Sequence, residues 1–293
     1  MTVREIFVGA DGGGRLRALW RLILFIVLVV ACSVVVFTVL AVPLSYIERV
    51  NGLQGTSEAT GLTVSLLLAH WLALRFLDRR PVSSVWMGAE AARPRALLYG
   101  FALGALPIAA ATLALVLVGQ LELAAAPEGA WLNAALRVTL LLAPAALYEE
   151  LFSRGYIFVT LGRWLGWPVA IALTSIAFGL LHVPNPGADP LPIVMVTLAG
   201  VYLAVVLLAT RSLYAAWMAH LGWNWVMAVV LHVAVSGLPF PRPGYEIVDD
   251  GPDWLTGGAW GPEGGVAAGA GMLGAMAYLY WRHTRRTNER IER

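Results

Sequence analysis

The chain has 293 residues, of which 59% are hydrophobic and only 13% are charged. A soluble domain carries about 25% charged residues, so this composition excludes an ordinary soluble protein and indicates a membrane protein. The formal net charge of +2 is too small to indicate a nucleic-acid partner, and the single cysteine, Cys32, excludes an internal disulfide and a cysteine cluster for a metal.

Apolar segments of bilayer-spanning length recur along the whole chain. About 20 apolar residues suffice for a helix to cross a bilayer, and backbone groups in lipid must be hydrogen-bonded within the segment. None of the segments has the alternating pattern of a membrane β-barrel strand. We therefore predict an all-α, polytopic membrane helix bundle of about eight transmembrane helices. The predicted spans are residues 20–44, 59–77, 95–119, 132–160, 168–183, 190–209, 212–233 and 264–282.

The arginines predict the orientation of these spans. With an even number of spans both termini share a side, and sixteen arginines fall on that side against three on the other. Because cytoplasmic loops are enriched in basic residues, we expect both termini in the cytoplasm. The three are Arg49, Arg137 and Arg242; the sixteen are Arg4, Arg15, Arg17, Arg21, Arg75, Arg79, Arg80, Arg93, Arg95, Arg163, Arg211, Arg282, Arg285, Arg286, Arg290 and Arg293.

The longest connection, residues 234–263, falls on the extracytoplasmic side and is rich in proline, glycine and acidic residues. Either a lid or a solvated linker fits this composition, and we favour the linker. The predicted parts are a cytoplasmic N-terminal tail (1–19), N-terminal transmembrane helices (20–128), a core with buried polar residues (129–233), the extracytoplasmic loop (234–263), and the last transmembrane helix with a basic cytoplasmic tail (264–293).

The fourth span contains three charged residues, Glu149, Glu150 and Arg154. Each costs at least about 2.5–3.5 kcal/mol at mid-bilayer on insertion scales, and such residues mark functional sites by default. Successive residues of a helix turn by about 100°, so Glu150 and Arg154 share a face and Glu149 points elsewhere. We predict that Glu150 and Arg154 form a structural ion pair and that Glu149 faces a cavity. The alternative is that all three clamp neighbouring helices together.

Two histidines and an asparagine supply the rest of this cluster. His182 ends the fifth span, and His220 lies in the seventh span with Asn224 one turn later. Glu149 and His182 lie roughly 24 and 22 Å of helix from the cytoplasmic turn between their spans. His220 and Asn224 lie roughly 12 and 18 Å from the next cytoplasmic turn. We expect the four residues to meet in one layer inside the membrane.

The remaining histidines are His70, His232 and His283. A lone histidine in a span is more often a hydrogen-bonding link between helices than a catalytic group. We therefore expect a structural role for all three.

A carboxylate, two imidazoles and a carboxamide in a low-dielectric cavity can hydrolyse a substrate by two routes. In the first, Glu149 acts as general base on a water, aided by His182. His220 and Asn224 then donate hydrogen bonds to the oxyanion. In the second, Glu149, His182 and His220 hold a zinc ion that activates the water. Both routes use the same residues, although the lack of an HExxH pair argues against a conventional zinc peptidase.

Three motifs occur at these positions in a fixed order. Glu149–Arg154 (EELFSR) matches EExxxR, Phe178–His182 (FGLLH) matches FxxxH, and His220–Asn224 (HLGWN) matches HxxxN. Together they resemble the CPBP family, which groups type II CAAX prenyl endopeptidases with bacteriocin-processing and immunity proteins, the Abi family. The resemblance covers about residues 130–233.

This resemblance implies an intramembrane endopeptidase, either a metalloprotease or a glutamate-type enzyme, that hydrolyses a peptide or membrane-protein substrate. It implies that Glu149 and His182 activate water. His220 and Asn224 would then hold the oxyanion or a metal. The residues that would shape the site are Glu150, Arg154 and Phe178.

Two other functions would use the same buried residues. A non-catalytic member of the family would bind a peptide or membrane partner, as in bacteriocin immunity. An ion- or proton-coupled transporter would use the Glu–Arg–His set as a relay, but no internal repeat supports this. We favour the protease and expect a multi-pass protein of a bacterial plasma membrane that contacts lipid and binds no nucleic acid.

Overall fold

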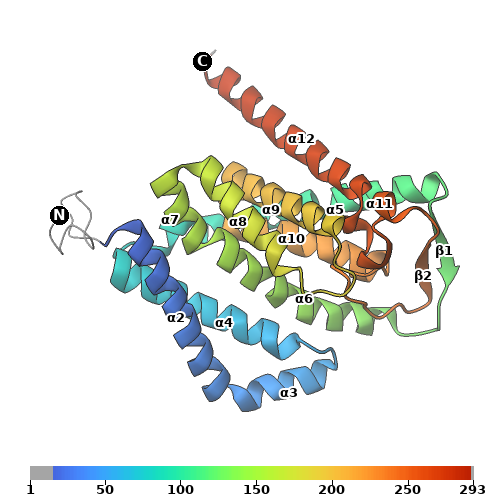
Figure 1. Ribbon diagram of the computed structural model, residues 1–293, viewed down its shortest axis with the longest axis horizontal. Helices are drawn as coiled ribbons and strands as arrows, with labels where there is room; N and C mark the ends of the chain where they lie inside the picture. The colour runs from blue at the N-terminus through green and yellow to red at the C-terminus, as the bar shows by residue number, and fades with distance from the viewer. Residues whose placement is uncertain (1–15, 292–293) are drawn as a thin grey trace.

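The computed structural model describes residues 16–291, with side chains to residue 285. The predicted N-terminal tail falls largely on residues 1–15, outside the described residues, as does Arg293 at the other end. Figure 1 shows a bundle of helices from which the last helix, α12, extends to the C-terminal end. The helices are α2 (Ala18–Val39), α3 (Ala41–Asn51), α4 (Thr56–Leu72), α5 (Pro94–Leu117), α6 (Trp131–Arg154), α7 (Tyr156–Leu165), α8 (Trp167–Leu181), α9 (Pro190–Thr210), α10 (Leu213–Trp225), α11 (Asp253–Thr256) and α12 (Val266–Ile291).

Shorter helical turns and one small sheet complete the fold. Wider π-helical turns extend α4 and α10, and a pair of antiparallel strands joins the connection after α5 to the long loop before α12. The π turns are η1 (Ala73–Asp78) and η4 (Val226–Val230), the 3-10 turns are η2 (Val82–Val85), η3 (Ala89–Ala92), η5 (Gly258–Trp260) and η6 (Pro262–Gly264), and the strands are β1 (Leu121–Ala125) and β2 (Tyr245–Asp249).

The predicted all-α membrane bundle is confirmed as a fold class. Within the described residues, five helical segments are long and apolar enough to cross a membrane, and α8 is a shorter apolar helix. The predicted spans 212–233 and 264–282 fall on α10 and α12, which do not meet the same measure. The five segments are Ala18–Val39, Thr56–Asp78, Pro94–Leu117, Trp131–Leu165 and Pro190–Thr210.

The outer faces of the bundle are apolar. On α2, Val27, Val30 and Val34 are each more than half exposed. Large exposed apolar surfaces are costly in water, whereas lipid tails cover them at no such cost. These faces therefore suit a lipid environment.

The predicted fourth span breaks at Gly155 into α6 and α7, which the continuous apolar pattern did not predict. The backbone N–H of Tyr156 donates to Nε2 of His70 at 3.0 Å instead of to a backbone carbonyl of the preceding helix. Nδ1 of His70 lies 2.7 Å from the carbonyl oxygen of Leu66 and donates to it. A Cβ at Gly155 would overlap the His70 ring. His70 is thus the hydrogen-bonding link between helices that we expected.

Helix α10 packs unusually close to α5 (Figure 1). A Cβ at Gly104 would overlap the backbone of Ala219, and one at Gly100 would overlap the backbone of Ala215. Small residues allow such close approach between membrane helices, where van der Waals packing supplies much of the attraction. This contact holds the part of α10 that carries His220.

The loop at 234–263 is packed against the bundle, so our interpretation of it as a solvated linker is wrong. Strand β2 pairs with β1 from Leu121 opposite Asp249 to Ala125 opposite Tyr245. Trp260 is only 1% exposed. The glycines that suggested a flexible linker instead allow tight turns, since Gly261 has a φ of +99° and its Cα faces the carbonyl of Ala234.

Candidate active site

Helix α6 carries the buried ion pair that helix phase predicted. Nη1 of Arg154 lies 3.2 Å from Oε1 of Glu150, and both side chains are fully buried. Nη2 of Arg154 donates a second hydrogen bond to the carbonyl oxygen of Gly200 in α9 at 3.0 Å. The predicted pair is confirmed, and it also ties α6 to α9.

Glu150 has a second partner that we did not predict. Nδ1 of His220, from α10, lies 3.0 Å from the same Oε1 atom. A carboxylate oxygen only accepts, so Nδ1 of His220 carries the proton. The role of Glu150 is therefore wider than pairing with Arg154, because it also fixes the tautomer and orientation of His220.

His182 is held by its own helix. It follows the last residue of α8, and its Nδ1 lies 2.8 Å from the carbonyl oxygen of Phe178, to which it donates. The Phe178 ring lies close to both His182 and Arg154. Its centroid is 4.8 Å from the ring of His182 and 4.3 Å from the guanidinium carbon of Arg154. The Phe178 ring therefore contacts both the Arg154 guanidinium and the His182 ring, and the Phe178 carbonyl orients His182.

The two histidines meet at Glu149. Oε2 of Glu149 lies 3.9 Å from Nε2 of His182 and 3.8 Å from Nε2 of His220. That oxygen is buried, and within the described residues it has no hydrogen-bond partner. Side chains from α6, α8 and α10 thus converge as the depth argument predicted.

The hydrogen bonds decide what these atoms can do. Nδ1 of each imidazole acts as the donor, so a ring in its neutral form presents a lone pair at Nε2. Oε2 of Glu149 also presents lone pairs. When both rings are neutral, three acceptors surround one point, and a molecule with two protons to donate, such as water, suits this point.

The cavity beside this point is small. Its volume is about 30 Å³, and His182, His220, Asn224 and Phe178 line it. A cavity of about 10–15 Å³ already accommodates one water molecule. Asn224 is half-buried, and in the part of the chain that the structure describes its amide makes no hydrogen bond. It is free to bind a molecule in the cavity.

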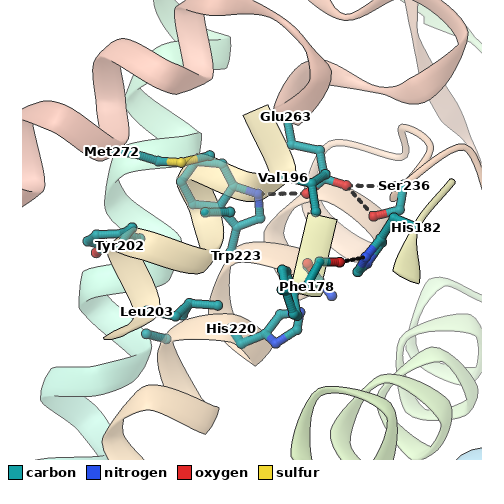
Figure 2. A pocket seen from close by; sticks show the side chains of 13 residues that line it. Phe178, His182, Val196, Tyr202, Leu203, His220, Trp223, Ser236, Glu263 and Met272 are labelled. Carbon is teal, nitrogen blue, oxygen red and sulfur yellow. Dashed lines mark hydrogen bonds between the residues drawn. The ribbon is translucent and has the colours of Figure 1, made fainter. Parts of the chain in front are cut away.

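Three further residues line the cavity that sequence reasoning missed: Trp223, Ser236 and Glu263. Figure 2 shows Glu263 between Trp223 and Ser236, on the wall of the cavity away from His220. Glu263 is 7% exposed. A carboxylate within a predicted extracytoplasmic loop resembles any solvated acidic residue, so no pattern in the sequence singled it out.

The residues do not fit the zinc site that we considered. Bonds of about 2.1 Å in a tetrahedron place zinc ligands about 3.4 Å apart, less than the 3.8–3.9 Å between Glu149 and the two histidines. In residues 16–285, no group of three or more His, Cys, Asp or Glu side chains is arranged to hold a metal ion.

His232 has the structural role that we expected. Its Nδ1 lies 2.7 Å from the carbonyl oxygen of Tyr245, and the two rings stack with centroids 4.2 Å apart. It holds β2 against the end of α10.

Comparison with known families places residues 131–226 in one model, described as type II CAAX prenyl endopeptidase Rce1-like. The match contains all three motifs, Glu149–Arg154, Phe178–His182 and His220–Asn224. The predicted family resemblance is thereby confirmed. No curated protein and no solved structure matches the chain.

Proposed function

Residues 131–226 of this integral membrane protein belong to the Rce1-like family of type II CAAX prenyl endopeptidases, and from this premise we propose that the chain is an intramembrane endopeptidase in which Glu149 activates a water. The family supports a peptidase in a lipid environment with a peptide or protein substrate. The residues that act and the route of the reaction are our proposal.

One observation carries the proposal. Two imidazoles on different helices direct their Nε2 atoms at the same unpartnered oxygen of Glu149. A packing clamp would pair its polar groups with one another, because an unsatisfied buried acceptor costs about 1–3 kcal/mol. Glu150 and Arg154 pair with each other, although Oε2 of Glu150 and Nε of Arg154 also have no partner in the described residues. Oε2 of Glu149 differs from these atoms because two imidazole nitrogens face it at 3.8–3.9 Å.

A water at this point would donate one proton to Glu149 and the other to Nε2 of His182 or His220. A lone pair of the water oxygen then remains for attack on the substrate. As the water oxygen bonds to the substrate carbonyl carbon, Glu149 takes the proton and acts as general base. This geometry supports Glu149 as the base and His182 as its aid.

The tetrahedral intermediate carries a negative charge on the former carbonyl oxygen. The amide of Asn224 can donate to that oxygen in its ordinary state. His220 can donate from Nε2 only if it enters the reaction as an imidazolium; the water then donates its second proton to His182, and Glu150 supplies the compensating charge at Nδ1 of His220. When the C–N bond breaks, the protonated Glu149 returns its proton to the leaving nitrogen. The oxygen, carbon and proton transfers therefore balance without a metal.

We propose the metal-free route because the spacing of Glu149 from the histidines suits a water better than a zinc ion. Glu150 and the Phe178 carbonyl would nevertheless serve either route, since they orient the two histidines. Metal dependence is thus a separate question with its own measurement.

Incubation of purified protein in detergent with a library of apolar peptides tests this function, with products identified by mass spectrometry. We expect internal cleavage by the wild type and none by Glu149→Gln. A wild type that folds and binds peptides without cleaving any would instead support the non-catalytic role. Cleavage by Glu149→Gln at the wild-type rate would overturn the assignment of the base.

A further inference from the structure

Glu263 is a third carboxylate at the candidate site, on the wall of its cavity. It comes from the turn η6, Pro262–Gly264, and lies outside the residues that match the family model. Only 7% of the residue is exposed. Figure 2 shows its carboxylate directed between Trp223 and Ser236. An acidic side chain in such a place calls for a specific role.

Three hydrogen-bond donors hold this carboxylate. Nε1 of Trp223 donates to Oε2 at 3.0 Å. The backbone N–H and the hydroxyl of Ser236 both donate to Oε1 at 2.7 Å. An ionised carboxylate only accepts hydrogen bonds, so it matches three donors, whereas an amide would turn its NH₂ group toward one of them.

The Trp223 bond connects Glu263 to helix α10. Trp223 lies one helical turn after His220 and directly before Asn224, and it lines the same cavity. It is 6% exposed, and its indole N–H has Glu263 as its hydrogen-bond partner. The bond to Glu263 fixes the orientation of the indole, and the indole forms the wall beside Asn224.

The Ser236 bonds connect Glu263 to the segment that follows α8. Ser236 has a φ of +49°, a conformation that non-glycine residues rarely adopt and that surrounding contacts must maintain. Its carbonyl oxygen accepts a hydrogen bond of 3.0 Å from Nδ2 of Asn185, three residues after His182. Gly237 has a φ of +77° and packs so close to Pro186 that a Cβ at this position would overlap the Pro186 carbonyl. The segment after α8 is therefore tied to Glu263 through Ser236.

We infer that Glu263 is a positioning residue for the hydrolysis proposed above, and the inference rests on that function. Its carboxylate joins the α10 segment that carries His220 and Asn224 to the turn that follows His182. With these segments fixed relative to each other, both histidines face Glu149. Glu263 acts through Trp223 and Ser236 and does not touch the reacting atoms.

A double-mutant cycle on turnover tests this role. Trp223→Phe removes the indole N–H together with part of the ring volume but keeps an aromatic side chain, and Glu263→Gln removes the charge and one acceptor. Because misplacement by about 1 Å can cost about 100-fold in rate, we expect each variant to lose at least about tenfold in kcat with KM within about twofold. We also expect the double variant to lose no more than the larger single loss, since both changes break one interaction.

Glu246→Gln is the matched control, because Glu246 lies in the same segment but pairs with the exposed Arg242 and does not line this cavity. Its kcat should equal that of the wild type. If Glu263→Gln does not fold, Trp223→Phe and Ser236→Ala carry the test. Wild-type kcat in these variants, even with a lower unfolding temperature, would overturn the inference alone. A wild type without any cleavage would overturn the proposed function together with it.

Discussion

Nδ1 of His220 donates to the same oxygen of Glu150 that receives Arg154, so one buried carboxylate serves both an ion pair and an imidazole. A carboxylate that orients a histidine fixes which ring nitrogen faces the cavity. The charged residues of α6 therefore have two different roles. Glu150 and Arg154 set the direction of His220, and Glu149 remains free for chemistry.

Arg154→Ala should destabilise the protein strongly. The substitution leaves Glu150 buried without its cation, and breaking a buried pair in this way costs about 3–5 kcal/mol. Thermal unfolding in detergent measures the effect. Arg242→Ala is the control, because Arg242 and Glu246 form an exposed pair worth about 0–1 kcal/mol. Equal unfolding temperatures for the two variants would contradict the structural importance of the buried pair.

Glu149→Gln should abolish turnover without destabilising the fold. The buried Oε2 atom of Glu149 has no hydrogen-bond partner in the described residues, so removing the charge relieves an unfavourable burial. General-base catalysis contributes about 10²–10⁴-fold, and we expect a loss of at least that size. The unfolding temperature should equal or exceed that of the wild type. A clear decrease would show that Glu149 has a structural partner.

His70→Ala should have the opposite effect. His70 satisfies the Tyr156 N–H at the helix break, and loss of that partner should cost about 1–3 kcal/mol. Because His70 does not line the cavity, kcat per folded molecule should stay within about twofold of the wild type. Unfolding experiments and kcat measured on the same preparation separate the two quantities. A large loss of kcat at unchanged stability would make His70 part of the site.

Removal of metal ions should leave the enzyme active. The 3.8–3.9 Å spacing of Glu149 from the histidines suits a water, and no described residues form a three-ligand metal group. Dialysis against a chelator, followed by elemental analysis and a turnover assay, makes the comparison. Turnover that disappears with the metal and returns on addition of zinc would establish the metal route instead.

Helix periodicity was enough to predict the central features of the site. Residues four apart on a helix share a face, which predicted the pairing of Glu150 with Arg154 and the separate direction of Glu149. Rise per residue predicted that His182 reaches the depth of Glu149. The apolar composition likewise predicted the membrane bundle, because only lipid makes so apolar a surface stable.

The features that were missed depend on contacts between distant segments. The Glu150–His220 bond needs α10 to pack against α6, and these two helices are far apart in the sequence. The break at Gly155 depends on His70 accepting the freed N–H. Glu263 was missed because a loop rich in glycine and acidic residues has the composition of a solvated linker, whether or not its backbone packs tightly.

The central claim is that Glu149, His182 and His220 act as one unit on one water. The kcat values of Glu149→Gln, His182→Ala, His220→Ala and the triple variant, each corrected for the folded fraction, test it most directly. Residues that act as a unit are non-additive, so we predict that each single change loses at least about 100-fold and that the triple variant loses little more. A single variant that turns over at the wild-type rate, or losses that multiply in the triple variant, would contradict the claim.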